Sequence, residues 1–155
     1  MATPRHPPQR GTPARAPRAP GRPLAEALRC VGDRWTLLVV EELLVGPRRF
    51  GELLEGLDGL APNILSRRLK ALEADGLLVA SPYSTRPYRV AYSLTAHGAE
   101  LASALRLLAQ WGAQRAPAAA PLHHATCGTV VEARWGCPTC ARTVADQEAP
   151  DIDYV

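Results

Sequence analysis

The chain has 155 residues, a hydrophobic fraction of 46% and a formal net charge of +3. This length is enough for one domain with a real core and too short for two large ones. No run of about eighteen apolar residues occurs, and the N-terminus lacks the apolar block of a secretory signal. We therefore expect a soluble, cytoplasmic protein without a membrane span.

Both ends of the chain have the composition of disordered tails. Residues 1–21 carry four arginines, no acid and almost no large apolar side chain, so they bury too little surface to offset the entropy of ordering. This basic segment is either a solvated leader without a role or an arm that adds phosphate attraction. A mitochondrial leader is a third reading, although the prolines would break its helix. The acidic residues 146–155 are also expected to be disordered.

Three helices are predicted in the first half of the chain. Apolar residues spaced three and four apart indicate a short amphipathic helix over 23–31. A second, more buried helix follows Asp33 and continues to the break at Gly46-Pro47. A third, short helix is expected to open at Arg48 and to close in the turn at Asp58-Gly59.

The helix that starts at Ala61 is amphipathic and basic. Pro62 suits its first turn, and Asp75-Gly76 supplies its stop. Its leucines recur at helical spacing, and its polar residues share the other face: Asn63, Ser66, Arg67 and Lys70. Two short helices joined by a tight turn, the second with a basic face, are typical of a helix-turn-helix.

The period of the pattern changes after Gly76. Short apolar runs at 77–83 and 88–94 flank a polar tip that contains Arg86, which predicts a two-stranded hairpin, or wing. Thr95 then caps one long apolar helix over 96–115. This last helix is expected to form a dimer surface with the helix at 23–31, or else to cover its own subunit. The predicted fold is α+β, mostly α: a winged helix-turn-helix domain over 22–115.

Five blocks of this sequence resemble the HxlR family, which are bacterial winged helix-turn-helix transcription regulators. The blocks keep their order and spacing over roughly 23–112: Gly32 to Thr36, Gly46 to Phe50, Leu65 with Arg68-Leu69 and Leu72-Glu73, Asp75 to Leu77, and Tyr92 to Thr95 with Gly98. The resemblance implies a homodimer that binds a pseudo-palindromic DNA operator in the bacterial cytoplasm, at the nucleoid. It also implies repression or activation in response to a small-molecule effector or to oxidants.

One position departs from the redox-sensing members of that family. They are similar in carrying a cysteine ten residues before the glycine of the Gly-Asp-Arg-Trp block, where this chain has Arg22. Cys30 lies in another register, between Leu28 and Val31, where a small buried hydrophobe is expected. The departure argues against the thiol switch of those relatives.

In a winged helix-turn-helix, side chains that reach base edges discriminate sequence while cations hold phosphates. The polar face of the helix from Ala61 supplies candidates for either role, with Arg67 suited to guanine and Asn63 to adenine. Arg68 lies nearer the apolar stripe and is assigned to phosphate or to a neighbouring carboxylate. The full set of candidate DNA-binding residues is Asn63, Ser66, Arg67, Arg68, Lys70, Arg48, Arg49 and Arg86.

A linker over 116–122 leads to a segment, 123–145, that contains three of the four cysteines. His124 and Cys127 form one pair with two residues between them, and Cys137 and Cys140 form another. Four such ligands can surround a zinc ion as in a zinc ribbon, and His123 could replace His124. The short separation of the pairs and the lack of glycine after Cys140 argue against zinc. The alternatives are a reversible Cys137–Cys140 disulfide and cysteines without a role.

Two other classes of protein could be built from a chain of this size. An enzyme would need a nucleophile–base pair or convergent carboxylates, which the sequence over 23–112 does not suggest, and His97 is expected at the surface. A protein-interaction adaptor on a winged-helix scaffold is the alternative, and the basic face of the helix from Ala61 argues against it. The sequence therefore favours a sequence-specific DNA-binding transcription regulator.

Overall fold

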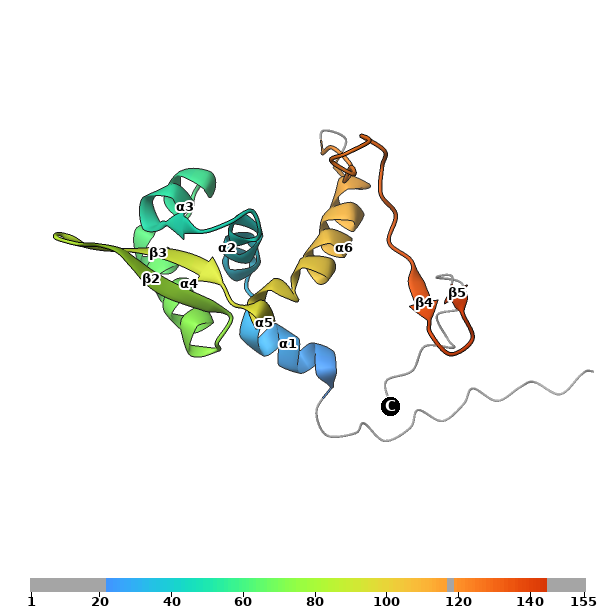
Figure 1. Ribbon diagram of the computed structural model, residues 1–155, viewed down its shortest axis with the longest axis horizontal. Coiled ribbons are helices and arrows are strands. Elements are labelled where there is room, and N and C mark those ends of the chain that lie inside the picture. Colours follow the sequence, from blue (N-terminus) through green and yellow to red (C-terminus); the bar gives the residue numbers. More distant parts are fainter. Residues whose placement is uncertain (1–21, 117–118, 145–155) are drawn as a thin grey trace, which may run out of the picture.

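The computed structural model describes residues 22–116 and 119–144 (Figure 1). The tails predicted over 1–21 and 146–155 lie outside this range, and the expected domain limits of 22–115 stay a prediction. The elements in chain order are α1 (Pro23–Val31), α2 (Arg34–Leu44), β1 (Arg48–Arg49), α3 (Phe50–Gly56), α4 (Pro62–Ala74), β2 (Leu78–Thr85), β3 (Tyr88–Leu94), α5 (Ala96–Ala99), α6 (Ala102–Ala113), β4 (Trp135–Cys137) and β5 (Arg142–Val144). Among the described helices, none has the length and apolar character needed to cross a membrane.

The first two helices meet at a tight corner. A Cβ atom at Gly32 would collide with the carbonyl oxygen of Leu28, so the backbone can pass this close only with glycine. The next residue, Asp33, caps α2, because its Oδ1 accepts hydrogen bonds from the backbone N–H of Trp35 at 3.0 Å and of Thr36 at 3.3 Å.

A three-stranded antiparallel sheet has the order β1-β3-β2. The predicted hairpin of β2 and β3 is confirmed, and we call it the wing. It extends well beyond the helices in Figure 1. The helix expected to open at Arg48 begins instead at Phe50, because Arg48 pairs with Tyr92 and Arg49 with Ala91 on the free edge of β3. That pairing keeps the two arginines extended.

The single helix expected over 96–115 is two helices, α5 and α6. At the junction, the N–H groups of Glu100 and Leu101 bond to carbonyls only three residues back, which tightens the chain and changes its direction. Upstream, Gly98 packs directly on the carbonyl oxygen of Leu77. Thr95 fixes the start of α5 by accepting from the N–H of Gly98 and donating to the carbonyl of Gly76. These contacts fix α5 against the residues that precede the wing, and the chain leaves the α-helical pattern directly after it.

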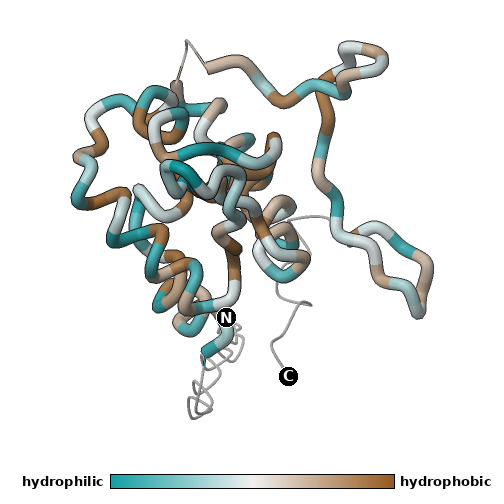
Figure 2. The backbone as a smooth tube through the Cα atoms, turned by 60° about the vertical axis from the view of Figure 1, so that its left-hand side comes forward, coloured by the Kyte–Doolittle hydropathy of each residue, from teal (hydrophilic) through white to brown (hydrophobic). Residues whose placement is uncertain are grey.

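The core lies where α2, α3 and α4 face the sheet. In Figure 2, hydrophobic and hydrophilic residues alternate along the helices, as expected of amphipathic helices with one buried side. The side chains buried to less than 2% exposure are the leucines and valines Leu53, Leu65, Leu72, Val39 and Val40. Three leucines of α4, the apolar stripe read from its sequence, are in this core. The structure confirms the α+β fold class and the helix–helix–wing order.

The buried stripe of α4 gives a direct test of this core. We predict that Leu65→Ala lowers the free energy of unfolding by about 2–5 kcal/mol, because it leaves a cavity among residues that are themselves fully buried. Urea denaturation followed by circular dichroism measures the change. Val45→Ala is the matched control, since Val45 is 78% exposed and its truncation should cost less than about 0.5 kcal/mol. Equal losses for the two variants would contradict the assigned core.

Candidate nucleic-acid interface

Helices α3 and α4 form the helix-turn-helix. The chain between them turns at Gly59, whose φ of +79° is in the left-handed region that favours glycine. Leu57 and Leu60 on either side of the turn are buried, so the turn is anchored in the core rather than hanging free. The turn predicted at Asp58-Gly59 is thus confirmed, and it holds α4 at a defined angle to α3.

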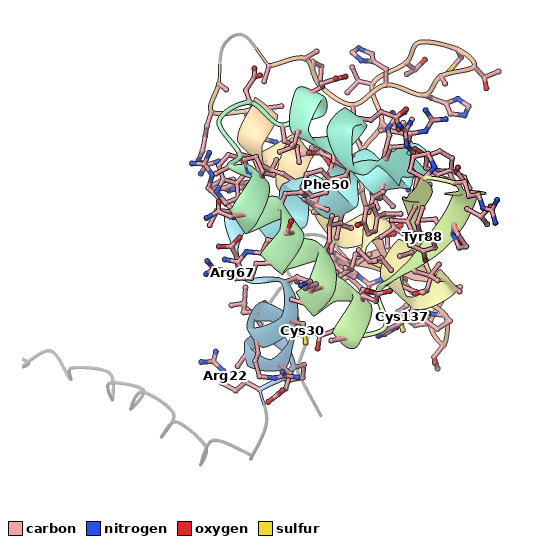
Figure 3. All side chains as sticks on the ribbon, turned by 90° about the vertical axis from the view of Figure 1, so that its left-hand side faces the viewer. Arg22, Cys30, Phe50, Arg67, Tyr88 and Cys137 are labelled. Carbon is pink, nitrogen blue, oxygen red and sulfur yellow. The ribbon has the colours of Figure 1, made fainter. Side chains whose placement is uncertain are left out.

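The outer face of α4 carries the polar residues expected there. Asn63, Arg67 and Lys70 are exposed, while Ser66 is half-buried. Arg67 points away from the body of the molecule in Figure 3. No ion pair engages Arg67 or Lys70 in the part of the chain that the structure describes. Both cations therefore stand free on one helix face, as phosphate or base contacts would require.

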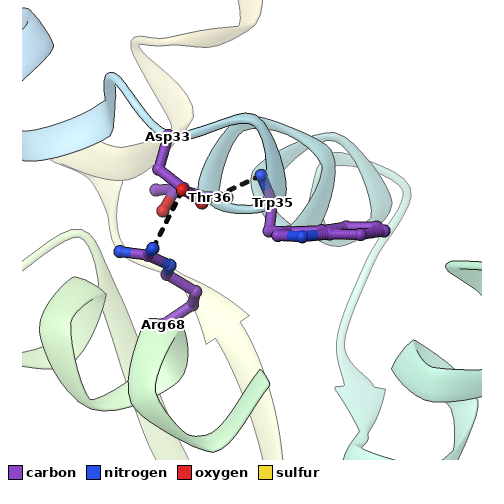
Figure 4. A network of polar contacts seen from close by, with 4 residues as sticks. All are labelled: Asp33, Trp35, Thr36 and Arg68. Carbon is purple, nitrogen blue, oxygen red and sulfur yellow. Dashed lines mark hydrogen bonds and ion pairs between the residues drawn. The ribbon is translucent and has the colours of Figure 1, made fainter. Parts of the chain in front are cut away.

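Arg68 faces the other way. Its Nη2 lies 2.8 Å from Oδ2 of Asp33, and both side chains are about one-third exposed (Figure 4). Of the two partners left open by the sequence, Arg68 takes the neighbouring carboxylate. Asp33 thus caps α2 with one oxygen and holds α4 with the other. The pair fixes the position of the basic helix against the helix that supports it.

The remaining predicted arginines lie on the sheet. Arg48 is half-buried, with its Nε 4.0 Å from Oε2 of Glu42, and the guanidinium of Arg49 lies 4.5 Å from the ring centroid of Tyr83 on β2. Arg86 is exposed at the tip of the wing. These three residues therefore reach different parts of one sheet, and only Arg86 is far from the helices.

Sequence reasoning missed two exposed residues of the wing. Arg89 lies on β3 opposite Ser84, and Tyr88 next to it is 72% exposed. The sequence contained a signal for Arg89: it is a second arginine, three residues after Arg86, on a hairpin already expected to approach DNA. Together the wing presents two cations and an aromatic ring to solvent.

We call residues 119–144 the C-terminal extension. Its candidate metal ligands form two separate pairs, His124 with Cys127 and Cys137 with Cys140. Nδ1 of His124 lies 3.3 Å from Sγ of Cys127. Hydrogen bonds between Cys127 and the neighbouring Thr129 and His124 lower the pKa of the Cys127 thiol to about 7. Bonds from Cys140 and from the backbone of Thr139 also lower the pKa of Cys137. Within the described residues, no three His, Cys, Asp or Glu side chains converge as metal ligands.

A tight helix pair, an exposed basic second helix and a protruding antiparallel hairpin define a winged helix-turn-helix protein of the DNA-binding class. Residues 30–120 match the family model described as HxlR-like helix-turn-helix. The chain belongs to this family and is a DNA-binding transcription regulator.

Known proteins are similar over most of the chain. An HTH-type transcriptional regulator of Mycobacterium tuberculosis (strain ATCC 25618 / H37Rv) is 39% identical over 139 residues, which cover 84% of this chain and 87% of that protein. Among solved structures, the transcription factor PA1607 has a TM-score of 0.71 at 31% identity, covering 83% of this chain and 92% of the other. A transcription factor structure from Pseudomonas aeruginosa has a TM-score of 0.62 at 36% identity, covering 82% and 88%.

The Asp33–Arg68 pair makes a prediction about stability. Arg68→Ala should lower the free energy of unfolding by about 1–3 kcal/mol, because it leaves a half-buried carboxylate with one partner fewer. Asp33→Ala should cost more, since it also removes the cap of α2, worth about 0.5–2 kcal/mol.

A double-mutant cycle with urea denaturation separates the two effects. Arg67→Ala serves as the control because Arg67 is exposed and, within the described residues, has no ion pair. If Asp33→Ala and Arg68→Ala were strictly additive, the pair would not couple the two helices.

Proposed function

We propose that this regulator binds a pseudo-palindromic double-stranded operator as a homodimer, with one α4 in the major groove of each half-site. A helix of this size fits the major groove, and a twofold protein reads a twofold site. The observation that carries the proposal is the exposed basic face of α4, where Arg67 and Lys70 have no ion pair among the described residues, backed by a buried leucine stripe. Such a protein works in the bacterial cytoplasm, where its operator is.

Within this arrangement the side chains divide into two groups. Asn63, Ser66, Arg67 and Lys70 contact base edges or nearby phosphates from α4. Arg48, Arg49 and the wing arginine Arg86 contact phosphates, which position the protein without reading sequence. Arg68 acts indirectly: its pairing with Asp33 sets the height and tilt of α4.

The dimer is proposed to form through α1 and α6. Both helices project from the same side of the winged unit in Figure 1. Each presents large apolar side chains to solvent that are more than half exposed: Leu24 and Leu28 on α1, Leu108 and Trp111 on α6. Burying side chains of this size against a second copy contributes roughly 1.5–3 kcal/mol each, which supports a stable association.

We also propose that operator binding responds to a small molecule. A cavity of about 350 Å³ lies between α1, α5 and the turn after α4, lined by Ala27, Cys30, Leu77, His97 and Leu101 among others. Its size and its mixture of apolar walls with a few polar groups suit a small ligand. Fragment screening by ligand-observed NMR, with Leu101→Trp as the filled-cavity control, would test it; fragments that bind both proteins equally would place the site elsewhere.

The helix face and the wing should differ in their effect on DNA binding. We predict that Arg67→Ala weakens operator binding by about 1–3 kcal/mol and relaxes sequence preference, because it removes a contact to a base edge. Arg86→Ala should weaken binding to all sequences and flatten the salt dependence, because it removes a phosphate contact. Fluorescence anisotropy on operator and random duplexes at several salt concentrations measures both effects.

Arg134→Ala is the matched control, because Arg134 is an exposed arginine outside α1, α4, α6 and the wing. It should leave affinity and salt dependence unchanged. If Arg67→Ala bound both duplexes with the affinity of the wild-type protein, α4 would not be the helix that reads the bases. A wild-type chain without salt-dependent DNA binding would favour the adaptor instead.

The dimer surface gives a further prediction. Leu28→Glu should convert the protein to a monomer and weaken operator binding, because a charge on the apolar stripe cannot be buried without a partner. Light scattering after size-exclusion chromatography measures the mass. Val45→Glu, at a side chain that is even more exposed but lies outside α1 and α6, should leave the mass unchanged. A Leu28→Glu protein of unaltered mass would exclude α1 from the interface.

A further inference from the structure

The C-terminal extension consists of two small hairpins. The first is closed by the bridge between His123 and Val130, where the N–H of His124 donates to the carbonyl of Thr129 at 2.8 Å. The second is formed by β4 and β5, with Cys137 opposite Arg142. Residues 131–134, without helix or strand structure, join the two hairpins.

Each hairpin carries a pair of metal-ligand side chains at its tip. In the first, the N–H groups of Cys127 and Gly128 both donate to the carbonyl of His124, at 3.2 and 2.8 Å, and this turn brings His124 and Cys127 together. Gly128, directly after the second ligand, has a φ of +70°. The turn therefore ends in a left-handed residue.

The second tip also has a left-handed residue directly after its second ligand. Cys137 ends β4, Cys140 follows in the turn, and the next residue, Ala141, has a φ of +52°. Among the described residues, Ala141 is the only one other than glycine with a positive φ. This conformation costs an L-residue about 1–2 kcal/mol. The left-handed turn that glycine would normally supply after Cys140 is thus present despite alanine.

The extension has almost no core of its own. Three of its large apolar side chains are exposed, with Val130 at 50%, Val131 at 38% and Trp135 at 58%. Two short hairpins that bury so little surface are marginal in water by themselves. Domains of this size commonly obtain their stability from a bound metal ion, whose binding free energy is also folding free energy.

We propose that the two tips close on one zinc ion, held by His124 and Cys127 from the first hairpin and by Cys137 and Cys140 from the second. Three thiolates and one imidazole are an established tetrahedral set for structural zinc. Closing the site requires the hairpins to fold together about residues 131–134, and each cysteine releases its proton to solvent on binding. His124 rather than His123 is the ligand, because His124 already faces the sulfur of its partner.

The similarity to known proteins extends into this part of the chain. Alignments that cover 84% of the sequence, as for the Mycobacterium tuberculosis relative, must include residues beyond 116, since residues 1–116 are a smaller share of the chain. At least the first part of the extension is therefore shared with that relative. As zinc at this place would be remote from α4, it bears on the stability of the extension rather than on base reading.

Zinc content of the full-length protein, purified without chelators, is the direct test. We expect about one zinc ion per subunit by elemental mass spectrometry, with loss of the metal in Cys127→Ser and in Cys140→Ser. Cys30→Ser is the matched control, because Cys30 packs against the core of the winged domain and should leave the metal in place. His123→Ala should also keep it, whereas His124→Ala should weaken it.

A second readout distinguishes four ligands from two. Cobalt(II) bound in place of zinc should show thiolate charge-transfer bands and tetrahedral d–d bands, which Cys127→Ser should reduce in step with Cys140→Ser. Operator binding by the same variants reports whether the winged domain is intact. A folded, metal-free wild-type chain, a Cys137–Cys140 disulfide under reducing purification, or metal that persists in Cys127→Ser would each overturn the proposal.

Discussion

The carboxylate of Asp33 is the point on which the DNA-binding unit depends. One oxygen satisfies two backbone N–H groups at the start of α2, and the other holds Arg68 of α4 at 2.8 Å. A helix that reads DNA needs a fixed orientation more than it needs extra affinity, because base contacts tolerate little displacement. The pair sets that orientation from the side of α4 that faces the supporting helix. It leaves Arg67, the residue just before Arg68, exposed on the outer face of α4.

Apolar packing also holds α4 in this orientation. The leucines of α4 are buried against α2 and the sheet, and the turn before α4 is anchored by Leu57 and Leu60. The short strand β1 joins α3 to the edge of β3, and Arg49 stacks on Tyr83 of the wing. Helix and wing are therefore held by one sheet and one core. This explains how a domain of modest net charge presents cations on two separate elements, α4 and the wing, at once.

The winged domain and the C-terminal extension are stabilised by different interactions. In the winged domain, burial of leucine and valine sets the structure, and polar contacts adjust it. In the C-terminal extension, local turns bring pairs of ligands together while most side chains remain exposed. A hydrophobic core cannot organise so short a segment. Coordination of a metal by those ligands would be the natural substitute.

The sequence alone determined most elements of the winged domain and their order, apart from β1 and the break between α5 and α6, because helical and strand periodicity, glycine turns and the cap residues are local features. It also placed Asn63, Arg67 and Lys70 on the exposed face of α4, since the apolar stripe defines the opposite one. Only the tertiary structure decided that Arg68 pairs with Asp33, that Arg48 and Arg49 join the sheet, and that the last helix breaks at Glu100. Each of these depends on what another segment brings alongside: a carboxylate 35 residues away, the free edge of β3, or the close seat of Gly98 on Leu77. The spacing of residues within one segment does not predict which other segment will pack beside it.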